Sequence, residues 1–332
     1  MIDKLSFFGK LVNGNSYHLQ IRREKAGKSV RRLGWLTGLI IMVVLSLDLS
    51  GCRTQTTTSA RQTGIHVVAS LNFYGEAARK ILGNDGTVTT VINSPSVDPE
   101  SFEPDIATAK KVARANVVIQ NGLGYDSWMQ RLVAANGHSD IQVLNLGNLV
   151  GRKMGANPHL WSDPQLMTQM TRQLVRQFSR LDPQHAAAFA RRGQAYERQL
   201  RALPRLAQQI KRHANGQQVA VSEPVFDLAL SAMGYRVSDG HFAQAIEEDS
   251  DPTPADITQL AAQIRHHKIA FFVENTQNSS KNVTTMVNLA RQYHVPVVKV
   301  TETKPIDQSY LTWMTSQYRQ VLRIQQEARS QS

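Results

Sequence analysis

The stretch from residue 65 to residue 93, IHVVASLNFYGEAARKILGNDGTVTTVIN, decides the fold. Its first part, Ile65–Leu71, is apolar, β-branched and of strand length, whereas Phe73–Leu82 has apolar residues at helical spacing. Thr87–Asn93 is β-branched again. A strand, a helix and a second strand in this order predict an α/β layer with a parallel sheet.

The same alternation continues along the chain in two blocks, which predict two lobes of the same class. The first block adds strands at Asn116–Asn121 and Ile141–Leu146 and helices at Ile106–Ala115 and Tyr125–Ala135. The second block has strands at Gln218–Ser222, Tyr235–Ser238, Ile269–Glu274 and Val295–Thr301, and helices at Phe226–Met233, Pro254–His266, Lys281–Tyr293 and Tyr310–Arg329. We therefore expect an N-terminal α/β lobe over residues 65–163 and a C-terminal α/β lobe over residues 216–332.

Residues 164–215 carry no strand pattern and are predicted to be helical throughout. Asp182 precedes Pro183 in an arrangement typical of a helix start. Residues 184–213 fit one long helix of about 45 Å, at a rise of about 1.5 Å per residue. Pro204 should kink this helix. We expect a stiff connection that allows only small motion between the lobes.

The N-terminal region has the layout of an export signal. Residues 33–51, LGWLTGLIIMVVLSLDLSG, are largely apolar, follow Arg31 and Arg32, and precede the single cysteine, Cys52. Asp48 leaves about 15 unbroken apolar residues, fewer than the roughly 20 that span a bilayer. Residues 49–52, LSGC, resemble the bacterial lipobox. We expect residues 1–51 to be a lipoprotein signal peptide and Cys52 the lipid attachment site; a transmembrane anchor is the alternative.

Residues 52–64 are polar and rich in Thr, which predicts a tether behind the lipid anchor. The mature protein should therefore be exported and held by its lipid, on the outer face of the cytoplasmic membrane or in the periplasm and cell envelope. The net charge of +12 does not change this expectation. Eight of the basic residues precede Cys52, and the others are scattered rather than interleaved with aromatic residues, so we expect no nucleic-acid partner.

Four polar residues follow predicted strands, where open parallel sheets bind their ligands. Glu100 lies in the loop after Thr87–Asn93, His159 comes after Ile141–Leu146, Glu223 ends one strand of the second block, and Glu302 ends another. Two of these residues come from each lobe. This distribution favours a binding site in the cleft between the lobes.

The motifs around these residues resemble those of the metal-binding family of ABC-transporter solute-binding proteins. They are Asp98–Pro104, Asn121–Gly124, Asn157–Pro164, Ser222–Phe226, Asp251–Pro254 and Phe271–Glu274. The most specific is NPHLWSDP, residues 157–164. The resemblance implies two lobes joined by a long helix, with a metal site in the cleft. It also implies a monomer that delivers manganese, iron or zinc to an ABC-transporter permease and is not an enzyme.

The resemblance implies Glu100, His159, Glu223 and Glu302 as metal ligands. Glu100 stands where the family usually has histidine, and Glu302 where it usually has aspartate. Three carboxylates and one imidazole favour Mn²⁺ or Fe²⁺, with Fe³⁺ as a further possibility, because oxygen donors suit these ions and allow more than four ligands. Zn²⁺ also binds such a set. No histidine-rich loop of the kind found in zinc receptors is present.

Each of these residues also has a structural interpretation. His159 would then be a hydrogen-bonded core histidine, and Glu223 would cap the helix that follows it. Glu302 would pair with Lys299 or Lys304 at the surface.

Two competing hypotheses concern the function of the whole protein. In the first, Glu100 is a solvated loop residue in a site that has lost a ligand, and the protein is an adhesin or a receptor for a non-metal solute. His241 belongs instead to the metal-receptor interpretation, as a reserve ligand that would enter the cleft from the loop after Tyr235–Ser238. In the second, a metal-dependent hydrolase uses Glu100 or Glu223 as general base. The chain has no HExxH, nucleophile-elbow or phosphate-loop motif to support such an enzyme.

Overall fold

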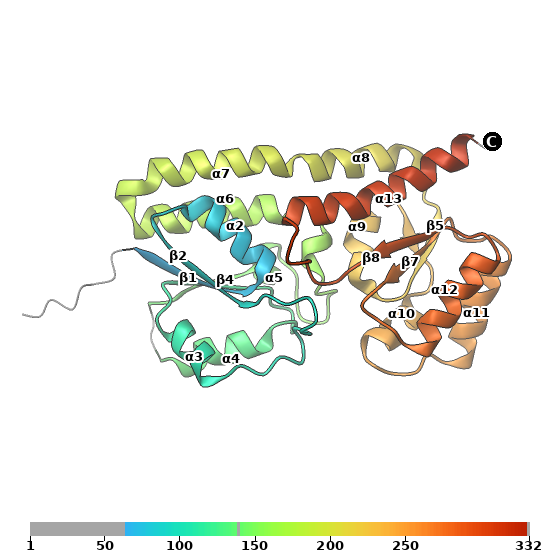
Figure 1. Ribbon diagram of the computed structural model, residues 1–332, viewed down its shortest axis with the longest axis horizontal. Helices are drawn as coiled ribbons and strands as arrows, with labels where there is room; N and C mark the ends of the chain where they lie inside the picture. The colour runs from blue at the N-terminus through green and yellow to red at the C-terminus, as the bar shows by residue number, and fades with distance from the viewer. Residues whose placement is uncertain (1–63, 138–139, 331–332) are drawn as a thin grey trace, which may run out of the picture. The chain divides into compact units, whose positions relative to one another are not determined.

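The computed structural model describes residues 64–137 and 140–330 (Figure 1). The predicted signal peptide, Cys52 and all of the predicted tether except Gly64 lie outside the described residues. Within the described part of the chain, no helix is both long enough and apolar enough to cross a bilayer.

Four parallel strands form the first sheet, in the order β2-β1-β3-β4 (Figure 1). They are β1 (Ile65–Leu71), β2 (Gly86–Ile92), β3 (Val117–Gln120) and β4 (Gln142–Asn145). Val67 in the central strand β1 pairs with Val88 on one side and with Val117 on the other. The strands near the middle are buried on both faces, which explains why they read as apolar runs.

Helices α2 (Asn72–Leu82), α3 (Ile106–Ala113), α4 (Ser127–Ala135) and the short α5 (Leu146–Leu149) accompany this sheet. Figure 1 shows α2 on one side of the sheet and α3 and α4 on the other. Helix α2 buries Phe73, Ala77 and Ile81, which lie four residues apart along one stripe. Asp105 caps α3, because its carboxylate accepts the backbone N–H of Thr108 at 2.7 Å.

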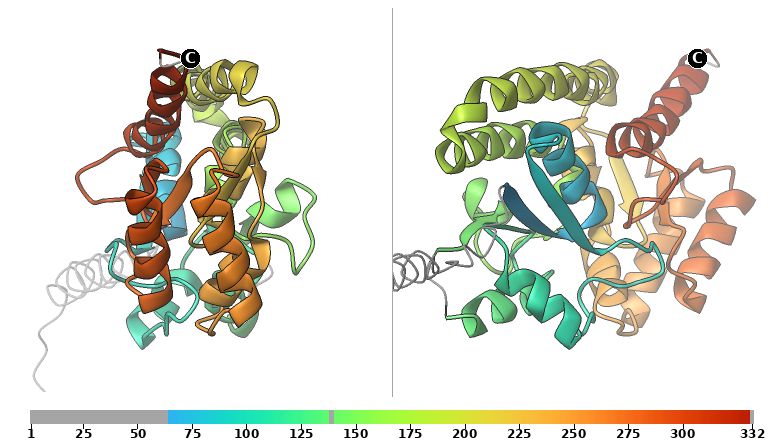
Figure 2. Two further views of the ribbon diagram at one scale, coloured as in Figure 1. Left: turned by 90° about the vertical axis from the view of Figure 1, so that its right-hand side faces the viewer. Right: turned by 60° about the vertical axis from the view of Figure 1, so that its left-hand side comes forward.

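The helical course predicted for residues 184–213 is present as two helices that meet at Arg201, a residue that keeps helical backbone angles. Helix α6 (Leu166–Leu181) runs beside α7 (Ala186–Leu200), and α8 (Ala202–Ala214) continues beyond Arg201 (Figure 2). Pro204 lies in the first turn of α8, where its missing N–H needs no partner. The same missing N–H leaves the carbonyl of Leu200 without an i+4 donor, so the interruption falls before the proline rather than at it.

The second sheet repeats the strand order of the first, as β6-β5-β7-β8, and is also parallel. Its strands are β5 (Gln218–Val221), β6 (Arg236–Val237), β7 (Phe272–Asn275) and β8 (Val297–Val300). The helices are α9 (Asp227–Ala232), α10 (Gly240–Glu247), α11 (Pro254–Arg265), α12 (Lys281–Gln292) and α13 (Tyr310–Ser330). The predicted α/β class with two parallel-sheet lobes is confirmed, although α10 was not predicted.

The two faces of the second sheet belong to different hydrophobic cores. Val219 and Val221 of β5 join the large core that continues into the first lobe, whereas Ala220 between them joins a smaller core. Ile264 of α11 and Val287 of α12 belong to this smaller core. Successive residues of a strand point to opposite faces, so one short strand contributes to both cores.

A buried aromatic cluster, formed by Phe73, Trp161, Tyr310 and Trp313, joins elements of both lobes. The ring of Phe73 lies 5.4 Å from that of Trp161 and 5.6 Å from that of Trp313. The Tyr310 hydroxyl donates to the carbonyl of Trp161 at 2.8 Å. Trp161 lies in the 3₁₀ helix Leu160–Ser162, and Tyr310 begins α13, so the cluster fixes the start of the last helix against the first lobe.

Trp313→Ala should lower the free energy of unfolding by about 3–5 kcal/mol, because it removes a fully buried ring from the aromatic cluster. Denaturant unfolding followed by circular dichroism measures this change. Met154→Ala, at a side chain that is 75% exposed, is the control and should change stability by less than about 0.5 kcal/mol. Equal effects of the two substitutions would show that the cluster does not join the lobes energetically.

Candidate metal-binding site

A cleft of about 1090 Å³ opens along the carboxyl ends of the strands of both sheets. From the first lobe it is lined by residues 95–101, and from the second lobe by residues that follow β5, α10, β7 and β8. In each sheet the strand that comes first in the sequence lies beside the one that comes third. The connections that follow these two strands run in opposite directions, which opens a crevice at the carboxyl ends of the strands. The fold therefore places a cleft where the sequence predicts a binding site.

Glu100, Glu223 and Glu302 line this cleft, and His159 lies behind them. His159 is fully buried, and its Nε2 atom lies 3.8 Å from Oε1 of Glu302. The fold thus gathers all four sequence-predicted residues at one cleft. These residues are far apart in the sequence. The fold brings them together because each lies after a strand of one of the two sheets, or in the loop beyond it.

The His159 ring is held in one orientation by Asn157. The side-chain Nδ2 of Asn157 donates to the carbonyl of Pro224 at 2.7 Å, and its Oδ1 accepts the backbone N–H of His159 at 2.8 Å. These two bonds fix which end of the amide is oxygen. Because Nδ1 of His159 lies 3.0 Å from the same Oδ1, Nδ1 must carry the proton, and Nε2 is left with a free lone pair.

The Nε2 atom is buried and has no hydrogen-bond partner among the described residues. Burial lowers the pKa of His159 to about 3, so the ring is neutral at physiological pH. A hydrogen-bonded core histidine would have both nitrogens satisfied, so that interpretation does not fit. A neutral imidazole with an oriented, unused lone pair is what a metal ligand requires.

Glu302 is positioned by both lobes. Tyr125 of the first lobe donates its hydroxyl to Oε1 of Glu302 at 2.6 Å, and Gln277 of the second lobe accepts the backbone N–H of Glu302 at 2.8 Å. Burial, with a smaller contribution from nearby carboxylates, raises the pKa of Glu302 to about 7, although the bond from Tyr125 opposes the shift. The expected pairing with Lys299 or Lys304 is absent from the described part of the chain; Lys304 instead lies 3.9 Å from Glu76.

Glu223 does not cap the helix that follows it, contrary to its structural interpretation. No side-chain capping bond is present at the start of the 3₁₀ helix Pro224–Phe226. Instead Asn275 donates to Oε2 of Glu223 at 2.6 Å and Asn278 donates to Oε1 at 2.7 Å. Burial is the main cause of the raised pKa of Glu223, and these two bonds act against it. The amides therefore hold the carboxylate in a fixed place beside the cleft.

Glu100 is exposed in its loop and lies next to Asp98, whose Oδ1 accepts the backbone N–H of Glu100 at 2.9 Å. Partial burial in the cleft raises its pKa, and the charge of Asp98 adds to the effect. The loop is anchored to the first lobe, since the indole Nε1 of Trp128 donates to the carbonyl of Pro99 at 3.1 Å. Phe102 packs edge-on against Trp128 with ring centres 4.8 Å apart.

Sequence reasoning missed Glu247, the last residue of α10. Its Oε1 lies 3.2 Å from Nε2 of His159, closer than the 3.8 Å that separates Oε1 of Glu302 from the same nitrogen. Phe242, Ala243 and Ile246 are buried, so the inner face of this helix carries a carboxylate at its end. The sequence signal for Glu247 is its position one helical turn after Ala243 on the buried face. Using that signal requires a helix to be predicted at α10 first.

Carboxylates dominate the charge of the cleft. Burial first, and then repulsion from other carboxylates of the cleft, led by Glu302, raise the pKa of Glu247 to about 9. No Lys or Arg is among the residues that line the cleft in the described part of the chain. We call this part of the molecule the acidic cleft, because seven acidic residues line it: Asp98, Glu100, Glu223, Glu247, Glu248, Asp249 and Glu302. Its charge suits a cation and opposes an anionic solute.

The donor atoms do not already surround one metal-sized point. Within the described ranges, no three His, Cys, Asp or Glu side chains converge closely enough to hold a metal ion. His159, Glu247 and Glu302 come nearest, because two carboxylate oxygens lie within 3.8 Å of the same imidazole nitrogen. Capture of an ion would therefore require small side-chain movements toward it.

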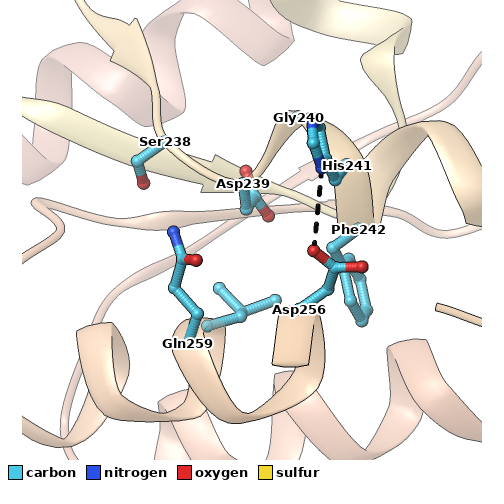
Figure 3. A pocket seen from close by; sticks show the side chains of 8 residues that line it. Ser238, Asp239, Gly240, His241, Phe242, Asp256 and Gln259 are labelled. Atoms are coloured by element: carbon cyan, nitrogen blue, oxygen red, sulfur yellow. Dashed lines mark ion pairs between the residues drawn. The ribbon is translucent and has the colours of Figure 1, made fainter. Parts of the chain in front are cut away.

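His241, the reserve ligand, lies in a different and smaller pocket of about 230 Å³ (Figure 3). Its side chain is 95% exposed, and its Nδ1 atom is 4.0 Å from Oδ1 of Asp256. Figure 3 shows this pocket between the start of α10 and the start of α11, lined also by Asp239 and Gln259. The lining residues of this pocket and of the acidic cleft do not overlap, so His241 does not contribute to the cleft.

Comparison with known proteins gives consistent matches over nearly all of the described chain. The family described as zinc-uptake complex component A, periplasmic, matches residues 67–323. The manganese-binding lipoprotein MntA of Halalkalibacterium halodurans is 25% identical over 265 residues, covering 75% of this chain and 83% of that protein.

Solved structures with the same fold include the solute-binding protein FpvC of Pseudomonas aeruginosa in complex with Mn²⁺. It has a TM-score of 0.65 and 21% identity, and the match covers 80% of this chain and 99% of that one. The periplasmic zinc-binding protein TroA of Treponema pallidum has a TM-score of 0.64 and 19% identity, with coverage of 79% and 99%. At these identities the structural matches show the shared fold.

Without metal, the protein should lose stability as the pH rises from about 7 to about 9. The folded state keeps a proton on Glu247 that the unfolded chain releases near the ordinary value of 4.5, so this stabilisation is lost as the pH rises toward 9. His159 contributes no slope in this window, since its pKa falls from 6.5 to about 3 on folding. Glu247→Gln should reduce the slope by up to about 1.4 kcal/mol per pH unit, measured by urea unfolding with a chelator present.

Glu248→Gln is the matched control for this measurement. Glu248 is exposed, and its carboxylate accepts a bond from Gln244 at 2.8 Å. The control should keep the wild-type slope. If Glu247→Gln kept it as well, the carboxyl group of Glu247 would be ionised in the folded protein at neutral pH.

Proposed function

Because this chain belongs to the family of the periplasmic zinc-uptake component A proteins, we propose that it is the substrate-binding component of an ABC importer that carries a transition-metal ion. The ion would bind in the acidic cleft and be delivered to a membrane permease. The family resemblance predicted from the sequence is confirmed, and with it the expectation of a substrate-binding protein rather than an enzyme. The hydrolase hypothesis is therefore set aside.

The observation that carries the proposal is the unpartnered Nε2 atom of His159. It is fully buried, its lone pair is free, and two carboxylate oxygens face it at 3.2 and 3.8 Å. Burying a polar atom without a partner costs free energy unless something binds there. A metal ion would satisfy the nitrogen and offset the repulsion among the carboxylates at the same time.

We infer that His159, Glu223, Glu302 and Glu100 are ligands of this ion. His159 would supply its oriented lone pair. Glu302 and Glu223 are already held at the cleft by Tyr125 and by two asparagines, which orient ligating oxygens as the partners of metal ligands generally do. Glu100, in its exposed loop, would join the ion last, from the first lobe.

The donor set favours Mn²⁺ or iron over Zn²⁺. Carboxylate oxygens suit harder ions and can become bidentate, which raises the coordination number above the four that Zn²⁺ prefers. Zn²⁺ would still bind, since affinities of a given site rise from manganese toward zinc. Manganese is also what the name of the relative MntA gives as its ligand.

We also propose that the protein is a lipoprotein attached through Cys52, as MntA is by its name. Residues 53–63 would provide reach between the lipid and the folded lobes. The anchor would hold the metal-binding cleft outside the cytoplasmic membrane, where an importer's permease receives its cargo. Each protein would work as a single chain.

His159→Ala should remove the metal-dependent stabilisation of the purified mature protein. At a free Mn²⁺ concentration about 100 times the dissociation constant, the wild type should gain about 2.7 kcal/mol, seen as a rise in melting temperature. The variant should lose at least about tenfold in affinity, because the imidazole is the sole nitrogen donor proposed for the ion.

His241→Ala is the matched control and should bind metal as the wild type does, since His241 lies outside the acidic cleft. Glu302→Ala should weaken binding as His159→Ala does. Wild-type affinity in both His159→Ala and Glu302→Ala would show that the ligand assignment is wrong. A wild type that gains no stability from Mn²⁺, Fe²⁺ or Zn²⁺ would contradict the proposed function itself.

Cys52→Ser should abolish acylation, because the lipid is attached to the cysteine sulfur. In a bacterial host the wild type should fractionate with membranes, and mass spectrometry should find an acylated Cys52 at the mature N-terminus. The variant should carry no lipid. A mature wild-type protein that begins at another residue, without lipid, would refute the anchor.

A further inference from the structure

The acidic cleft contains one carboxylate, that of Glu247, which no sequence motif of the proposed ligand set includes. It ends α10, and its side chain is only 15% exposed. The helix is attached to the second sheet at its other end, where both carboxylate oxygens of Asp239 accept the backbone N–H of Val221 at 3.1 Å. Phe242 and Ile246 are buried in the small core, so the position of Glu247 is fixed by packing.

The separation between Glu247 and His159 matches that of two ligands of one metal ion. Donor atoms about 2.1 Å from a metal lie about 3.0 Å apart at a right angle and about 3.4 Å apart at a tetrahedral angle. Oε1 of Glu247 is 3.2 Å from Nε2 of His159, whereas Oε1 of Glu302 is 3.8 Å from it. Glu247 therefore needs less movement than Glu302 to share an ion with the imidazole.

The ring of His159 does not donate a hydrogen bond to Glu247. Nε2 has no hydrogen-bond partner among the described residues, even though the carboxylate oxygen is within reach. The proton of the ring is on Nδ1, where Asn157 accepts it. The lone pair of Nε2 thus faces a carboxyl oxygen of Glu247 across a gap that the ring proton does not occupy, and a cation in that gap would be bound by both atoms.

We propose that Glu247 is a direct ligand of the transported ion, and that it biases the site toward ions that take more than four ligands, such as Mn²⁺. This inference rests on the proposed function. With Glu247 the donor set becomes one nitrogen and oxygens from four carboxylates. Five side chains exceed the four-coordinate shell that Zn²⁺ prefers, but they suit the five or six positions of a harder ion.

The test compares the affinities of Glu247→Gln and the wild type for Mn²⁺ and for Zn²⁺, each measured by calorimetry at neutral pH on the mature protein. Glu247→Gln should weaken Mn²⁺ binding at least about tenfold, because a carboxylate oxygen is a stronger ligand than an amide. Zn²⁺ binding should weaken by less than about threefold, because four donors remain for it. Equal losses for the two ions, or no loss, would overturn the inference.

Two further variants separate a ligand from a distant charge. Glu248→Gln removes an exposed carboxylate that lines the same cleft one position away, and it should change the Mn²⁺ to Zn²⁺ preference less than about twofold, since exposed charges are screened. Glu247→Asp keeps the charge and withdraws the oxygens by one methylene. It should show the selective loss of Mn²⁺ as well; wild-type affinity in this variant would mean that Glu247 acts only through its charge and would overturn its role as a ligand.

The failure of this inference is distinguishable from failure of the proposed function. If the wild type binds Mn²⁺, His159→Ala does not, and Glu247→Gln binds as the wild type does, only the role of Glu247 is refuted. If the wild type binds neither ion, both are refuted. Thermal unfolding in chelator checks folding, and Glu247→Gln should unfold at the same or a higher temperature than the wild type because an amide, unlike a carboxylate, needs no proton in order to be buried.

Discussion

The packing of Trp161 against Phe73, Tyr310 and Trp313 is the constraint on which the rest of the structure depends. It joins the segment between the first lobe and α6 to the first turns of α13, and so links both sheets through one core. His159 precedes Trp161 by two residues, and the two rings lie 5.2 Å apart, edge to face. Tyr125 packs on both rings and bonds Glu302 across the cleft. The geometry of the acidic cleft therefore follows from the packing of apolar surface beneath it.

The charge of the acidic cleft opposes folding in a way that the packing must offset. Seven acidic residues line the cleft with no Lys or Arg among the described lining residues, and burial raises the pKa of Glu302 and Glu247. Each raised pKa means that ionising the group costs stability in the folded state. A metal ion would reverse this balance, because the repulsion that weakens the metal-free protein becomes attraction to the ion. Lower stability without metal and affinity for a cation are thus two results of one charge distribution.

The sequence predicts the fold well because the strands are short β-branched runs separated by helices with clear periodicity. The same logic located the cleft, since Glu100, Glu223 and Glu302 each follow a strand and His159 lies in a distinctive motif. Glu247 was missed because α10 is eight residues long and has few apolar positions, so its sequence has no periodic pattern that predicts a helix. The interruption that Pro204 causes falls at Arg201, because a proline removes the hydrogen bond to the residue four positions earlier. Contacts such as that of Asn157 with Pro224 join segments 67 residues apart, which no local pattern reveals.

The repeated strand order of the two sheets has a consequence for how the protein would let go of its cargo. Each sheet brings only some of the proposed donor atoms to the cleft, so neither lobe alone would offer a complete coordination shell. Metal–ligand bonds are only about 2–2.6 Å long and weaken steeply with distance. A permease that separated the lobes by about one bond length would remove the ligands of one lobe together, without protonating or reducing anything. The residence time of the ion would then be set by the mechanical stiffness of the aromatic core that joins the lobes.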